Sequence, residues 1–124
     1  MGYSTEFKGK ISFDQEVSEL FAEEINFFCR KRHCTEDNHN KTSDYAPSLW
    51  CDWEVAEDRK GLEWNGSEKS YDMDKWLPLL INKFLEPAGI ICNGFVEAQG
   101  ENVGDHWAIE VTDNEVRILE CNFC

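Results

Sequence analysis

Apolar and polar residues alternate near the start of the chain, over residues 6–13. The apolar positions are Phe7, Ile11 and Phe13, and the polar positions are Glu6, Lys8, Lys10 and Ser12. A period of two predicts a strand with one buried face. After Asp14, which can cap a helix, the spacing changes to that of a helix of about 14 residues with one apolar face. That face consists of Val17, Leu20, Phe21, Ile25 and Phe28.

The middle of the chain predicts a loop, two short strands and a second helix. Residues 35–47 are polar and end in proline, which is typical of a loop. The stretch 49–55 alternates again, and a short strand over 62–64 ends at an Asn-Gly turn. The second helix has an apolar face formed by Trp76, Leu77, Leu80, Ile81 and Phe84. Pro87 and Gly89 end that helix.

The last third of the chain predicts three antiparallel strands. Their inward positions are Ile90, Cys92, Val96 and Ala98, then Trp107, Ile109 and Val111, then Val116 and Ile118. The first six predicted elements match a ferredoxin-like (split βαβ) core, and the last two add a C-terminal hairpin. We therefore expect a single α+β domain over residues 1–124, with two helices packed on one face of a mainly antiparallel sheet. Trp53, Trp64, Trp76 and Trp107 are expected to be buried.

The net charge of the chain limits the kinds of molecule that it can bind. Lys and Arg total 12 against 25 Asp and Glu, a net charge of −13. Binding to nucleic acid or to an anionic membrane surface needs clustered cations, so direct contact with either is disfavoured. No apolar run approaches the ~20 residues that span a bilayer, and the start of the chain lacks the apolar stretch of a signal peptide. We expect a cytoplasmic protein.

The six cysteines are expected to be reduced in that compartment. Cys51 and Cys92 fall at apolar positions of predicted strands, where a thiol acts as a small hydrophobic group. Structural zinc needs two closely spaced ligand pairs, and only the terminal C-x-x-C has that spacing. The weak metal candidates are Cys29, Cys34, His39, Cys121 and Cys124. We expect no metal or other cofactor, and a zinc-stabilised interaction domain is the alternative.

The sequence contains no signature of catalysis. There is no G-x-S-x-G nucleophile motif and no phosphate-binding loop. Asp105 precedes His106, but neighbours on a strand point to opposite faces and cannot act as a pair. We therefore predict that the chain is not an enzyme.

Alternation also predicts which side chains the sheet presents to solvent. If Trp53 and Trp64 face the helices, the opposite face carries carboxylates with aromatic neighbours. Its expected members are Trp50, Asp52, Glu54, Glu63, Phe95, Glu97 and Glu110, with Arg117 as the one cation. The carboxylates of such a face repel one another. The face either keeps the chain in solution or docks in a basic groove of another protein, where charge steers the encounter and aromatic rings anchor it.

Three stretches carry a resemblance to a known family: residues 3–9 (YSTEFKG), 62–69 (LEWNGSEK) and 93–101 (NGFVEAQGE). With them the chain resembles a group of short acidic bacteriophage and prophage proteins without an established activity. The resemblance implies a phage origin and the cytoplasm of a bacterial host. Together with the acidic face, it predicts a non-catalytic inhibitor of a host nucleic-acid-handling or defence protein, of the anti-CRISPR or anti-restriction type. A small-molecule-binding protein and a virion or assembly component are the alternatives.

Overall fold

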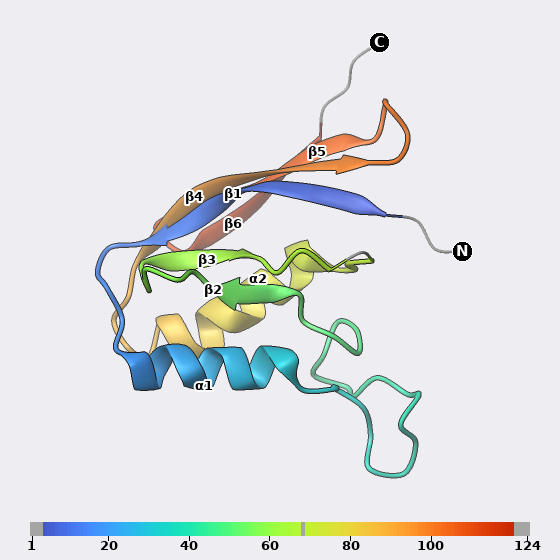
Figure 1. Ribbon diagram of the computed structural model, residues 1–124, viewed down its shortest axis with the longest axis horizontal. Coiled ribbons are helices and arrows are strands. Elements are labelled where there is room, and N and C mark those ends of the chain that lie inside the picture. The colour runs from blue at the N-terminus through green and yellow to red at the C-terminus, as the bar shows by residue number, and fades with distance from the viewer. Residues whose placement is uncertain (1–3, 68, 121–124) are drawn as a thin grey trace.

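The computed structural model describes residues 4–67 and 69–120. The elements are β1 (Thr5–Phe13), α1 (Glu19–Arg30), β2 (Trp53–Val55), β3 (Gly61–Trp64), α2 (Met73–Leu80), its π-helical continuation η1 (Ile81–Leu85), β4 (Cys92–Gly100), β5 (His106–Thr112) and β6 (Glu115–Glu120). Both helices lie on the same side of the sheet (Figure 1), so the predicted α+β class is confirmed. No helix in the described part of the chain has the length and apolarity to cross a membrane.

The six strands form one sheet in the order β2-β3-β1-β4-β5-β6, and all neighbouring strands are antiparallel. β1 therefore lies inside the sheet although it comes first in the chain. β3 separates β1 from β2, and β1 separates β3 from β4, which is the interleaving that a split βαβ plan requires. The ferredoxin-like assignment rests on this strand order and stays a prediction.

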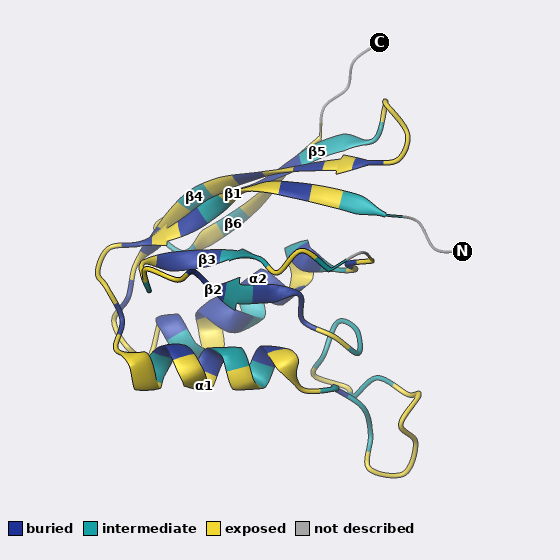
Figure 2. Ribbon diagram, viewed as in Figure 1, coloured by how far each residue is buried: buried dark blue, intermediate teal, exposed yellow. Residues whose placement is uncertain are grey.

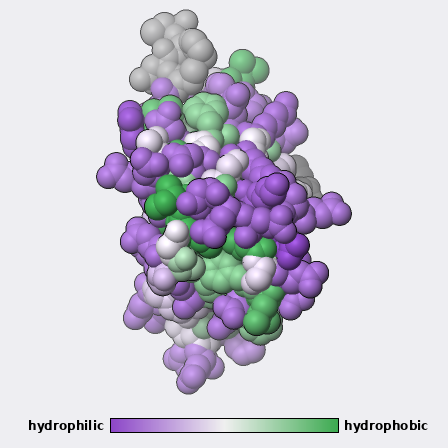
Figure 3. Space-filling view, turned by 90° about the vertical axis from the view of Figure 1, so that its left-hand side faces the viewer, coloured by the Kyte–Doolittle hydropathy of each residue, from purple (hydrophilic) through white to green (hydrophobic). Residues whose placement is uncertain are grey.

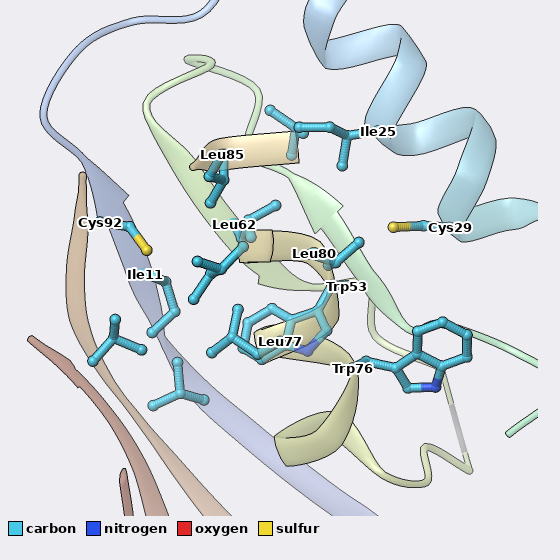
Figure 4. Packing of buried hydrophobic residues seen from close by; sticks show 14 of the residues in the cluster. Ile11, Ile25, Cys29, Trp53, Leu62, Trp76, Leu77, Leu80, Leu85 and Cys92 are labelled. Carbon is cyan, nitrogen blue, oxygen red and sulfur yellow. The ribbon is translucent and has the colours of Figure 1, made fainter. Parts of the chain in front are cut away.

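The core lies between the helices and the inward side of the sheet (Figures 2 and 4). Ile11 and Leu62 face each other across β1 and β3, and both are fully buried. Trp53 and Trp76 are buried as predicted. The Trp53 indole N–H donates to the carbonyl of Met73 at 2.9 Å, so the large ring is buried without an unsatisfied donor.

Two of the four tryptophans depart from the prediction. Trp64 and Trp107 are half-buried. They lie on either side of Phe7, with ring centroids 5.5 Å and 5.9 Å from the Phe7 ring. Alternation assigned both rings correctly to the inward face, but neither is buried to the degree of Trp53.

The first helix begins later than its sequence predicts. Ser18 is the N-cap, and its hydroxyl accepts the N–H of Phe21 at 3.1 Å. Asp14 instead joins the end of β1 to the start of β4. Its N–H donates to the carbonyl of Ile91 at 2.9 Å, and its carboxylate accepts the N–H of Ile91 at 3.2 Å. Asp and Ser both suit an N-cap position. Here the bonds between Asp14 and Ile91 engage Asp14 elsewhere, and Ser18 caps the helix.

Helix α1 covers the free edge of β2. The Val55 N–H, which an edge strand would leave unpaired, donates to the side-chain oxygen of Asn26 at 2.9 Å. This bond holds the C-terminal half of α1 beside β2 and protects the edge from pairing with another chain.

Candidate functional site

Side chains that point away from α1 and α2 form the surface that we call the outer sheet face. One row of this face crosses all six strands through Glu54, Glu63, Lys10, Phe95, Glu110 and Arg117, in spatial order from β2 to β6. Lys10 stands beside Glu63 because Ile11 pairs with Leu62 one position along. Figure 2 shows exposed positions alternating with buried ones along β1 and β4, as expected for a sheet with one covered side.

Charges on the outer sheet face are mixed. Its acidic residues are Glu6, Glu54, Glu63, Glu97, Glu110 and Glu115, and its basic residues are Lys8, Lys10 and Arg117. Six carboxylates against three cations give a formal balance of −3, so most of the net charge of −13 lies elsewhere. Figure 3, which views the end at the left of Figure 1, shows hydrophilic side chains over much of that surface too. The prediction that Arg117 is the one cation on this face is wrong, because β1 carries two lysines through its middle.

Three close pairs involve polar or charged side chains of the outer sheet face. The Lys10 ammonium lies 2.9 Å and 3.1 Å from the carboxylate oxygens of Asp58, and this ion pair lowers the pKa of Asp58. Arg117 lies 3.6 Å from the Glu110 carboxylate. His106 Nε2 lies 3.3 Å from the Glu97 carboxylate. Glu110 therefore has a cationic partner within the chain, and Glu97 has a polar contact with the His106 ring.

Glu54 and Glu63 differ from the other carboxylates of this face in their position relative to each other. They stand directly opposite each other across the antiparallel β2–β3 pair, and both are half-buried. Neither makes an ion pair with any residue in the described ranges. Lys10, the nearest cation along the row, is held by Asp58 instead. Like charges directly opposite each other in a sheet are destabilising, so we expect this pair to lower the stability of the fold.

Phe95 is the large apolar side chain of the row. It is 45% exposed, and its cross-strand neighbours are Lys10 and Glu110. It stands two strands from Glu63, which corresponds to about 10 Å at the usual strand spacing. The ring therefore offers an apolar contact within reach of the Glu54–Glu63 pair.

Two of the expected face residues lie outside the strands. Asp52 precedes β2 and is buried, and its carboxylate accepts the side-chain N–H of Asn65 at 3.3 Å. Trp50 is 45% exposed in the segment before β2, with the Arg32 guanidinium 5.5 Å from the ring centroid. The structure thus groups Glu54, Glu63, Phe95, Glu97 and Glu110 on the strands and leaves Trp50 and Asp52 in the preceding loop.

The metal candidates do not converge in the described part of the chain. Cys29 is buried against Cys51, Cys34 is half-buried, and His39 is exposed. No group of three or more His, Cys, Asp or Glu residues within residues 4–67 and 69–120 is placed to hold a metal ion. Cys121 and Cys124 lie outside the described residues. The zinc-stabilised alternative therefore gains no support from this structure.

Sequence reasoning missed a buried histidine. His33 is fully buried, with the rings of Phe28 and Trp76 at 4.6 Å and 4.9 Å. Its Nε2 lies 2.8 Å from the Phe28 carbonyl, which can only accept, so Nε2 carries the proton. In the neutral ring Nδ1 then accepts the Tyr45 hydroxyl at 2.6 Å. Burial lowers the pKa of His33. Because the residue lies in an irregular segment, no periodicity marks it.

A hollow of about 530 Å³ lies beside this histidine. Its lining consists of Phe28, Lys31, Tyr45, Leu79, Asn82 and Lys83. The Lys83 ammonium is 5.2 Å from the centroid of the Phe28 ring. Apolar walls with a few polar groups are typical of sites for small molecules.

Comparison with protein-family models, with curated proteins and with solved structures found no match to this chain. The resemblance to phage proteins therefore stays a prediction. Function has to be argued from the outer sheet face and from the hollow.

Proposed function

We propose that this chain is a non-catalytic binding protein that docks on a basic surface of another protein through Glu54, Glu63 and Phe95. The observation that carries the proposal is the Glu54–Glu63 pair, in which two glutamates stand directly opposite each other and neither forms an ion pair with a described residue. A lysine at either position would turn the repulsion into attraction. Two glutamates at these positions are explained if a partner supplies the positive charge that pairs with them.

The chemistry of this surface favours an arginine-rich partner. A guanidinium is planar and carries several donors, so one arginine can bind two neighbouring carboxylates. Phe95, about two strand spacings away, would anchor an apolar or aromatic group of the same partner. Charge would steer the encounter, and the ring would supply buried apolar area.

We assign the partner to host proteins that handle nucleic acids or act in defence, because their grooves carry Lys and Arg for phosphate contact. The resemblance to phage proteins supports this choice, and the action would be inhibition of the anti-CRISPR or anti-restriction type. Duplex DNA carries one negative charge per ~1.7 Å of its axis. Lys8 and Lys10 place positive charge in the middle of the outer sheet face, so this face is a poor mimic of a whole DNA duplex. The chain would instead block one local basic site.

The test is recovery of a partner by tagged chain from lysate of a bacterial host, at low and at high salt. We expect wild type to retain a nucleic-acid-handling protein at low salt and to release it at high salt. Glu54→Lys with Glu63→Lys should lose that protein. The control is Glu6→Lys with Glu115→Lys, which makes the same change of charge on the same face away from the pair.

Two outcomes would contradict the proposal. Recovery that is unaffected by the Glu54/Glu63 reversal would exclude the pair as the contact, whichever partner is found. If the Glu6/Glu115 control variant loses the partner to the same extent, the effect comes from the change in net charge and not from the Glu54–Glu63 pair. Purified partner then provides the functional readout, since its binding or cleavage of nucleic acid should fall when the wild-type chain is added and remain with the double reversal.

The hollow beside His33 supports a second candidate function, the binding of a small anionic aromatic molecule. Lys31 and Lys83 provide positive charge there, and neither makes an ion pair with another described residue. Phe28 and Leu79 provide apolar contact. An aromatic sulfonate dye is a suitable probe, with binding followed by its fluorescence. Lys83→Ala should weaken binding several-fold and Lys60→Ala, an exposed lysine outside the hollow, should not. Equal affinities would exclude the site.

A further inference from the structure

Two cysteine sulfurs touch in the core. Cys29 lies in the last turn of α1, and Cys51 lies two positions before β2. Their Sγ atoms are 3.4 Å apart, and each residue is only 2% exposed. Figure 4 shows the Cys29 side chain pointing from α1 into the packed interior. No other cysteines of the described residues make a sulfur–sulfur contact.

From this contact we propose that Cys29 and Cys51 form a reversible disulfide when the chain meets a low-molecular-weight disulfide such as oxidised glutathione. A disulfide needs about 2.05 Å between its sulfurs, so the two atoms must approach by only about 1.4 Å. This inference is independent of the proposed binding function.

The backbone around the pair is already fixed on both sides. Next to Cys29, the Asn26 side chain accepts the Val55 N–H at 2.9 Å. Next to Cys51, the Leu49 carbonyl accepts the His33 N–H at 2.7 Å. These bonds hold the end of α1 beside the segment that enters β2, so the approach needs side-chain rotation and a small backbone shift rather than a rearrangement.

The other described cysteines lack this arrangement. Cys34 is half-buried, and Cys92 lies in β4, where burial raises its pKa to about 11. A half-buried single thiol such as Cys34 can take up one small thiol as a mixed disulfide, but it has no neighbouring cysteine among residues 4–67 and 69–120 to complete the exchange. The two kinds of product differ in mass, which makes the pair distinguishable from single thiols.

The exchange proceeds in two balanced steps. One cysteine thiolate attacks a sulfur of the small disulfide, forming a mixed disulfide and releasing one small thiolate, which takes up the proton that the cysteine lost. The second cysteine then attacks the mixed disulfide, forms the Cys29–Cys51 bond and releases the second small thiol. The cysteine pair loses two electrons, and the small disulfide gains them. Because contact with Cys51 and burial raise the pKa of Cys29, the attack proceeds from a transiently opened state and is slow.

The bond would join the two ends of the segment 30–50, which includes His33, Tyr45 and Trp50. In the reduced chain that segment has little regular structure apart from one bridge between Cys34 and Thr42. Closing it at both ends restricts the unfolded chain and local opening. The oxidised form should therefore melt about 10 °C higher and resist proteolysis in this segment.

The test uses the full reduced chain and oxidised glutathione under native conditions. After an acid quench, free thiols are alkylated in denaturant, and the chain is digested without reductant for mass spectrometry. We expect a product that has lost two alkylation sites, a peptide pair joining Cys29 to Cys51, and full reversal by dithiothreitol. Cys34→Ser and Cys92→Ser should keep the cross-link, and Cys51→Ala should lose it together with the rise in melting temperature.

Because Cys51→Ala could itself weaken the core, the peptide map of the wild-type chain is the deciding measurement. Complete alkylation of Cys29 and Cys51 after prolonged oxidation would overturn the proposal. A map that joins either of them mainly to Cys34, Cys92, Cys121 or Cys124 would do the same. If the cross-link forms but neither melting temperature nor proteolysis changes, the stabilising role of the bond is overturned.

Discussion

The Glu54–Glu63 pair makes a prediction about stability that can be tested without knowing the partner. If the two carboxylates repel each other, removing one charge should stabilise the fold. Cross-strand pairs contribute roughly 0.2–1 kcal/mol, and both residues are half-buried, which reduces solvent screening. We therefore expect Glu63→Gln to raise the free energy of unfolding by about 0.5–1 kcal/mol, since glutamine keeps the size of the side chain.

The assay is urea unfolding followed by tryptophan fluorescence at low salt and in 1 M NaCl. Glu54→Gln and Glu63→Gln should each raise the urea midpoint at low salt. The double substitution should add little to either single one, because the first substitution already removes the repulsion. In 1 M salt, where the screening length is about 3 Å, the gain should shrink. The matched control is Glu115→Gln, on the same face but opposite Thr112, and should leave the midpoint unchanged.

Three results would refute the reasoning. If Glu63→Gln is neutral or destabilising at low salt, the pair carries no repulsion, and the main support for the binding proposal is lost. If the effects of the two single substitutions add fully in the double variant, the carboxylates do not interact. A gain of equal size in Glu115→Gln would instead trace the effect to net charge.

Three further predictions follow from the fold. Ser18→Ala should lower the free energy of unfolding, measured with urea, by about 1 kcal/mol because α1 loses its N-cap. An unchanged free energy of unfolding would mean that Ser18 is not the effective cap and would favour Asp14 instead. Ile11→Ala should cost about 2–5 kcal/mol through the cavity left at a fully buried site, and a smaller loss would mean that the core collapses into the space. Burial lowers the pKa of His33 below its ordinary 6.5, so the unfolded chain takes up the proton first as the pH falls. The contribution of the neutral His33 to the free energy of unfolding is therefore complete above about pH 6.5 and is lost as the pH falls through the folded pKa. In the wild-type chain the urea midpoint should fall between pH 7.5 and pH 5.5, and His33→Gln should reduce that fall. The control His39→Gln, at an exposed histidine, should leave the fall unchanged.

The sequence predicted the faces of the strands better than their positions in the sheet. Alternation placed Glu54, Glu63 and Phe95 on the solvent side, and the structure has them there. It also placed Lys8 and Lys10 on the polar side of the first strand. Strand order, however, is set by long-range pairing and leaves no local periodicity. Without the strand order, the sequence could not show that Lys8 and Lys10 lie between β3 and β4, in the middle of the outer sheet face.

Local signals were also ambiguous where tertiary contacts choose between equivalent residues. Asp14 and Ser18 both suit an N-cap, and the bonds between Asp14 and Ile91 decide in favour of Ser18. His33 lies after a helix in a polar stretch, where exposure is the usual expectation. Its burial depends on Phe28, Tyr45 and on an indole from α2, all of them contacts that a single sequence does not reveal.

The position of the charge matters more to function than its total. A net charge of −13 suggested a uniformly acidic sheet, but the outer sheet face carries a balance of only −3, and Glu110 lies in an ion pair with Arg117. What distinguishes Glu54 and Glu63 is that they stand directly opposite each other and form no ion pair among the described residues, while Lys10 on the next strand binds Asp58. Dispersed surface charges favour solubility at little cost to a fold. Two carboxylates held opposite each other do not improve solubility further, and they weaken a three-residue edge strand. A partner's cation would relieve that repulsion, which is why the binding proposal rests on this pair and on no other part of the acidic surface.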